Sequence, residues 1–75
     1  MSGGWENMKK LSVNISGHLT SLSIEDEFLN TLKDIASKKN KSVSQIIREI
    51  DENRKGDTNL SSAVRIWILI EVKDK

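Results

Sequence analysis

Few side chains of this chain are suited to catalysis or to metal binding. The 75 residues include no Cys and a single His, His18. A thiol nucleophile, a disulfide, a thiolate metal site and a His-based zinc site are therefore excluded. The 11 acidic residues fall where helix starts and solvated helix faces are expected, and the four glycines form no phosphate-binding loop. We therefore expect no enzyme activity, no cofactor and no metal site.

The side chains better suited to binding form a basic run that follows an acidic one. Residues 25–37 carry four acids and one lysine, whereas residues 38–48 carry four basic side chains and no acid. A basic block of this kind suits a surface that faces an anion. A solvated lysine-rich turn has the same composition, so charge alone does not separate the two interpretations.

A phosphate site is predicted where this basic run meets the start of a helix. Unpaired backbone N–H groups in the first turn, the helix dipole and nearby lysines together favour a bound phosphate. The two serines here have two possible roles, phosphate contact and ordinary helix capping. The predicted phosphate-binding residues are Lys39, Lys41, Ser42, Val43 and Ser44.

The elements that must position these groups begin with extended chain. Apolar and polar residues alternate from Leu11 to Ile15, as in a strand, and again from Leu19 to Ile24. Gly17 between them is either a turn joining two strands or a kink within one. The alternation puts one set of side chains outward, namely Leu19, Ser21 and Ser23.

Two helices are predicted next. The first extends from about Glu25 to Lys39, with Asn40 in the left-handed capping position. The second begins after Ser42 or Ser44 and continues to about Lys55, where Gly56 stops it. Its apolar stripe consists of Val43, Ile46, Ile47 and Ile50.

The segment from Leu60 to Val72 is ambiguous. Its alternating β-branched residues favour a strand, whereas Leu60, Val64 and Trp67 also fit one face of a helix. Within it, Arg65 either contacts DNA or forms a structural ion pair with Asp51 or Glu49, and we favour the ion pair. We expect Trp67 to pack in a core or dimer interface.

A chain this short buries little apolar surface, and with no disulfide or metal we expect oligomerisation to stabilise it. A single strand also needs a partner for its backbone groups. The same strand of a second chain would supply one, and the resulting antiparallel ribbon fits the major groove of DNA. The predicted dimer core contains Leu22, Ile24, Phe28, Leu32, Ile46, Ile47, Ile50 and Trp67. We expect residues 1–10 to form a flexible lead and residues 11–75 the domain.

Several segments in this order resemble the ribbon-helix-helix superfamily of the Arc and MetJ repressors. They are the strand and helix start at residues 20–28, the residues 32–36, and the second helix start at residues 41–47. The chain is still more similar to a bacterial subfamily of short predicted DNA-binding proteins. The residues that carry this similarity are Gly17-His18-Leu19-Thr20-Ser21, Ile50-Asp51 and Asn59-Leu60-Ser61-Ser62-Ala63.

The resemblance implies a third helix over Leu60 to about Val72, and we adopt it over the propensity argument. It also implies that Leu19, Ser21 and Ser23 read DNA bases. The subfamily usually has Arg at position 19, so Leu19 replaces a bidentate guanine reader with a side chain suited to a thymine methyl group.

The sequence therefore predicts a mainly helical ribbon-helix-helix fold, forming an intertwined homodimer with a two-stranded ribbon and an extra C-terminal helix. The expected function is sequence-selective binding of double-stranded DNA, as a transcriptional repressor. The alternative is a protein-interaction module, such as an antitoxin, that binds a partner through the apolar C-terminal segment. No stretch approaches a membrane span and no apolar signal segment begins the chain, so we expect a cytoplasmic protein.

Overall fold

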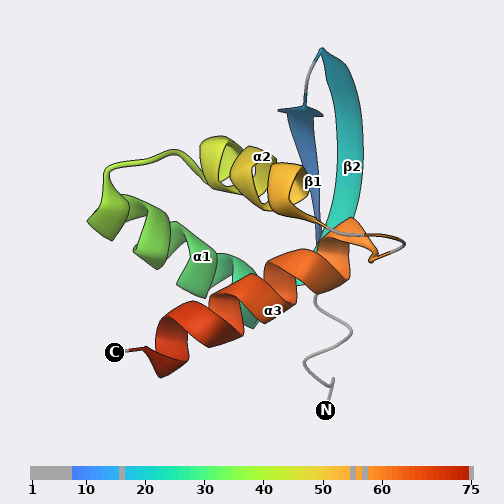
Figure 1. Cartoon of the computed structure of the whole chain (residues 1–75). Helices are drawn as coiled ribbons and strands as arrows, with labels where there is room; N and C mark the ends of the chain where they lie inside the picture. Colours follow the sequence, from blue (N-terminus) through green and yellow to red (C-terminus); the bar gives the residue numbers. More distant parts are fainter. Residues whose placement is uncertain (1–7, 16, 55, 57, 75) are drawn as a thin grey trace.

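The computed structural model describes residues 8–15, 17–54, 56 and 58–74. Two antiparallel strands, β1 (Met8–Ile15) and β2 (His18–Glu25), precede three helices, α1 (Asp26–Lys39), α2 (Val43–Asn53) and α3 (Leu60–Lys73). The strands form a hairpin that projects beyond the helices, and the helices lie together on one side of it (Figure 1). This order of elements confirms the predicted fold class, a two-stranded antiparallel ribbon with three helices.

The partner of β2 differs from the sequence-based expectation. The strand pairs with β1 of the same chain, from Met8 opposite Glu25 to Ile15 opposite His18, so the expectation of a strand without an intrachain partner is wrong. Gly17 is the physical reason, because its φ of 84° lies in the left-handed region that a tight hairpin connection requires. Its backbone N–H also donates to Asn14 Oδ1 over 3.1 Å.

Strand β1 also begins earlier than the predicted domain. Residues 8–10 belong to the strand and pair with β2, whereas the sequence interpretation assigned them to a flexible lead. The rest of that predicted lead, residues 1–7, lies outside the described residues.

Helices α1 and α2 follow the predicted periodicity closely. Asn40 ends α1 in the left-handed conformation, with φ 57° and ψ 41°, as expected. Ser42 caps α2 by accepting a hydrogen bond from the Gln45 N–H over 3.0 Å, and this decides between the two predicted caps. Helix α2 ends at Asn53, two residues before the predicted end.

Helix α3 confirms the assignment implied by the resemblance and overturns the strand propensity of this segment. The Asn59 side chain accepts hydrogen bonds from the Ser61 and Ser62 N–H groups at its start. Leu60, Val64 and Ile68 recur every four residues and are all buried against the other elements. Burial of this stripe outweighs the weak strand preference of β-branched side chains.

One core joins the inner face of the hairpin to all three helices. Six of the eight residues predicted for the dimer core are buried within the single chain, and Phe28 and Trp67 pack against them half-buried. Those six are Leu22, Ile24, Leu32, Ile46, Ile47 and Ile50. They are therefore core residues of the protomer itself.

Candidate nucleic-acid interface

The exposed face of the hairpin is the first part of the candidate site. Side chains alternate between the two faces of a strand, so Leu22 and Ile24 point into the core while their neighbours point outward. Of the predicted base-facing residues, Leu19 and Ser21 are exposed and Ser23 is half-buried, with Leu19 at 78% exposure. The structure thus gathers this trio on one accessible face.

Strand β1 adds side chains to the same face that the sequence interpretation missed. The register places Lys10 opposite Ser23, Ser12 opposite Ser21, and Asn14 opposite Leu19. All three β1 residues are exposed. The available signal was the alternation of Ser12 and Asn14 with buried neighbours, but it is informative only once Gly17 is known to close a hairpin.

An ion pair between Glu25 and Arg65 connects the end of β2 to α3. Arg65 donates to both carboxylate oxygens of Glu25, Nε to Oε1 over 2.7 Å and Nη2 to Oε2 over 3.2 Å. The hydrogen bonding from Arg65 holds the pKa of the Glu25 carboxyl below its usual value. A structural role for Arg65 is confirmed, but both predicted partners were wrong, because Glu49 pairs with Lys41 and Asp51 with Arg54.

The turn between α1 and α2 is the second part of the candidate site. The left-handed Asn40 reverses the chain, and the Lys41 N–H donates to Ala36 O over 2.9 Å. The N–H groups of Val43 and Ser44 begin α2 and have no acceptor within the helix, which is the usual state of a first turn. Partial positive charge is therefore directed outward from this end of α2.

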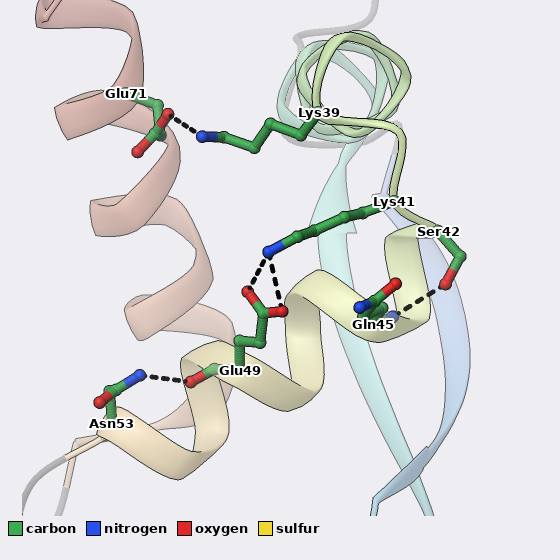
Figure 2. A network of polar contacts seen from close by, with 7 residues as sticks. All are labelled: Lys39, Lys41, Ser42, Gln45, Glu49, Asn53 and Glu71. Carbon is green, nitrogen blue, oxygen red and sulfur yellow. Dashed lines mark hydrogen bonds and ion pairs between the residues drawn. The ribbon is translucent and has the colours of Figure 1, made fainter.

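The two predicted phosphate-binding lysines are engaged in ion pairs. Lys41 Nζ lies 3.0 and 2.9 Å from the two Glu49 carboxylate oxygens, and Lys39 Nζ lies 3.4 Å from Glu71 Oε1. Figure 2 shows Lys41 extending towards Glu49, whereas the Ser42 hydroxyl lies on the other side of the turn. The two lysines are therefore close to the start of α2 in sequence, but their side chains are directed away from the first-turn N–H groups of that helix.

These ion pairs are partly exposed, with the lysine side chains at 42% and 35% exposure. Pairs in such positions contribute about 0–1 kcal/mol to stability, because water and salt screen them. A phosphate group could therefore compete for either lysine at small cost. The Lys39–Glu71 pair could not be predicted from the sequence, because the two residues lie far apart along the chain.

An apolar face of α3 forms a third accessible feature. A shallow cavity of about 270 Å³ lies between α2 and α3, bordered by Ile50, Ala63, Ile66, Trp67 and Ile70 along with Glu49 and Asn53. The exposed large hydrophobic residues of α3 are each about half accessible, namely Ile66, Leu69, Ile70 and Val72. This face is suited to contact with another protein surface.

Across residues 8–15, 17–54, 56 and 58–74, no three or more His, Asp or Glu side chains lie close enough to hold a metal ion. None of the helices in the described part of the chain is long and apolar enough to cross a membrane.

Comparison with known families matches residues 8–72 to the ribbon-helix-helix domain. The match spans the hairpin and all but the end of the third helix, so the chain belongs to this family of DNA-binding regulators. Neither the curated proteins nor the solved structures gave a match.

Proposed function

We propose that this protein is a sequence-selective transcriptional regulator that binds double-stranded DNA as a homodimer and represses the genes it occupies. The observation that carries the proposal is the uncovered hairpin face, which projects from the helices in a chain of the ribbon-helix-helix family (Figure 1). A two-stranded β-ribbon fits the major groove, where base edges differ between all four base pairs. Repression follows because occupancy of a site by this domain excludes other proteins from it.

Within this proposal, the outward residues Leu19, Ser21 and Ser23 contact base edges, and the start of α2 contacts the DNA backbone. The backbone N–H groups of Val43 and Ser44 supply donors for a phosphate oxygen. The Lys39, Lys41 and Ser42 side chains lie beside these donors in sequence and add positive charge or a hydroxyl group. The regulator would act in the cytoplasm, in contact with the chromosome.

A DNA-selection experiment on the purified protein, at a stated salt concentration, tests the central claim. We expect enrichment of one sequence motif, together with an affinity that falls steeply as salt rises. If the selected DNA contains no enriched motif, the protein does not bind DNA sequence-selectively and the proposal is wrong.

The phosphate assignment predicts a specific salt response. Lys41→Ala should weaken binding to all DNA sequences about equally, and the slope of log affinity against log salt should become shallower by about one unit for the phosphate that Lys41 no longer neutralises. The matched variant is Glu49→Gln, which frees the Lys41 ammonium group from its ion pair. It should bind DNA as tightly as the wild type or more tightly. If both variants weaken binding alike, the ion pair is structural and Lys41 does not bind phosphate.

The homodimer is supported by the exposed apolar face of α3 and not by a missing strand partner. Ile66 and Ile70 border the cavity beside Trp67 and remain about half exposed in a single chain. A second copy covering this face would bury them, and each protomer would then offer its own hairpin to one half-site. We expect sedimentation to give a dimer mass and the melting temperature to rise with protein concentration. A monomer mass with a concentration-independent melt would contradict this.

The same face supports a second candidate function, a protein-interaction module such as an antitoxin that binds a partner through α3. The favouring observation is again the exposed row on this helix, Ile66, Leu69, Ile70 and Val72. The two functions are compatible, because the hairpin and this face use different residues. A wild-type protein that selects no DNA sequence, encoded beside a toxin-like gene, would favour the interaction module alone.

A further inference from the structure

Glu25 lies where the strand that carries the proposed base-reading residues becomes a helix. Strand β2 ends at Glu25 and α1 begins at the next residue, Asp26, so no linker separates the two elements. The Glu25 backbone is extended, with φ −65° and ψ 148°, and occupies the N-cap position of the helix. The angle between β2 and α1 is therefore set at this one residue.

The Glu25 side chain is not used for capping. A residue at this position commonly accepts a hydrogen bond from a first-turn N–H group, but the Glu25 side chain makes no such bond. Instead, its two carboxylate oxygens accept hydrogen bonds from Arg65, over 2.7 and 3.2 Å. The carboxylate thus connects β2 to α3 and leaves the start of α1 without a bond from its N-cap side chain.

Arg65 holds the Glu25 carboxylate in a fixed orientation. Two hydrogen bonds from a planar guanidinium fix the plane of a carboxylate as well as its distance. The helix that carries Arg65 is itself held in the core, because Val64 is fully buried and Leu60 and Ile68 are buried one turn away on either side of it. Only about a quarter of each paired side chain is exposed, 27% for Arg65 and 24% for Glu25.

The other contacts between β2 and the helices constrain its tilt less closely. Leu22 and Ile24 are buried in the core, but the hydrophobic effect that holds them there has no direction. A hydrogen bond, by contrast, depends on angle as well as on distance. Within the described part of the chain, the bonds between Glu25 and Arg65 are the only side-chain hydrogen bonds that link β2 to a helix.

A small tilt at Glu25 becomes a large displacement at the far end of β2. Leu19 lies six residues before Glu25, and a strand rises about 3.3 Å per residue, so the two residues are about 20 Å apart. A rotation of about 10° over that distance moves Leu19 by about 3.5 Å, which is about one base-pair step of DNA. The alignment of β2 with the base pairs therefore depends on the angle fixed at Glu25.

We propose that Arg65 is a positioning residue for DNA recognition, which acts through the Glu25 carboxylate to set the angle at which the outward face of β2 meets the base pairs. In this role Arg65 does not itself contact DNA. The inference rests on the proposed DNA-binding function, and it adds a residue of α3 to those that determine specificity.

The test is Arg65→Lys in the full-length protein, measured with the DNA site that the wild type selects and with random DNA of the same length. Lysine keeps the positive charge but has no planar pair of donors, so it attracts Glu25 without fixing its orientation. We expect the ratio of the two affinities to fall by about 5- to 150-fold, which is the usual effect of one mismatched base pair. The affinity for random DNA and its salt dependence should stay at the wild-type level, because the phosphate contacts are unchanged.

A second variant, Glu25→Asp, separates positioning from stability. Aspartate is a favoured N-cap residue, so its carboxylate should bond the first turn of α1 in place of Arg65. We expect the midpoint of urea unfolding to stay the same or to rise, while the ratio of affinities falls as it does for Arg65→Lys. An ion pair that served stability alone would not give this combination. The variant also carries the test if circular dichroism shows that Arg65→Lys is unfolded.

The matched control is Arg54→Lys, which makes the same substitution in an ion pair at the end of α2. Arg54 Nη2 lies 2.8 Å from Asp51 Oδ1, and the two side chains have similar exposure to the Glu25–Arg65 pair, at 34% and 22%. Both residues belong to α2 or to its C-cap, so their pair does not orient β2. This variant should keep the wild-type ratio of affinities.

The outcomes separate this inference from the function on which it rests. A wild type that selects no motif contradicts the DNA-binding proposal itself. If the wild type selects a motif and the Arg65 and Glu25 variants keep its ratio of affinities, Arg65 has no positioning role and the proposed function stands. Equal losses of affinity for selected and random DNA would also overturn the inference, because the pair would then serve the fold or bind phosphate directly.

Discussion

Replacing Ile47 with alanine is expected to lower the free energy of unfolding by about 2–5 kcal/mol. The side chain is fully buried, at 0% exposure, on the face of α2 that also carries Ile46 and Ile50. Truncation removes three methyl or methylene groups from water-free surroundings and leaves a cavity that the neighbours fill only in part. Because small domains have about 5–15 kcal/mol of stability in total, this single change removes a large share of it.

The measurement is urea denaturation of both proteins at one concentration, followed by circular dichroism. Arg48→Ala is the matched control, since Arg48 is the next residue of α2 and is exposed. It should change the free energy of unfolding by no more than about 0.5 kcal/mol. A loss below about 0.5 kcal/mol for Ile47→Ala would show that α2 presents a different face to the core.

The helices of this chain are predictable wherever local signals agree. The stripe from Val43 to Ile50 repeats at helical spacing, Ser42 has a short side chain that caps well, and Asn40 tolerates a positive φ. Each of these signals acts within a few residues, so no knowledge of the tertiary fold is needed. Helix α3 lacks this agreement, because its β-branched residues favour a strand locally, and burial of Leu60, Val64 and Ile68 outweighs that preference.

The pairing of the strands could not be derived in the same way. Gly17 is compatible with a turn or a kink, and only the closed hairpin, with Ile15 opposite His18, decides between them. That ambiguity hid the contribution of Asn14 to the candidate site, although alternation alone placed Leu19 and Ser21 outward. Ion pairs are still less accessible to sequence analysis, because Glu25 and Arg65 are separated by 40 residues and meet only in the folded chain.

The identity of residue 19 should control how strongly the protein reads its DNA site. Leu19, Ser21 and Ser23 carry no charge, and none of them can make the bidentate base contact that typically gives about 1–3 kcal/mol of discrimination. Leu19→Arg should therefore increase affinity and shift the preference towards guanine at one base pair of each half-site, since arginine bonds O6 and N7 together. The change should be tolerated by the fold, because Leu19 is 78% exposed and contributes little to the core.

A parallel DNA selection with the wild type, Leu19→Arg and a control of equal charge measures this effect. Ser37→Arg is the control, because Ser37 is exposed on α1, outside the hairpin, and the substitution adds the same positive charge. It should raise affinity for all sequences slightly without changing the preferred bases, since added charge attracts phosphate in any sequence. If the wild type and Leu19→Arg instead enrich the same sequences at the same strength, the hairpin face does not enter the groove. The DNA-reading role would then have to move to another surface, and the uncovered hairpin face would be left for a protein partner.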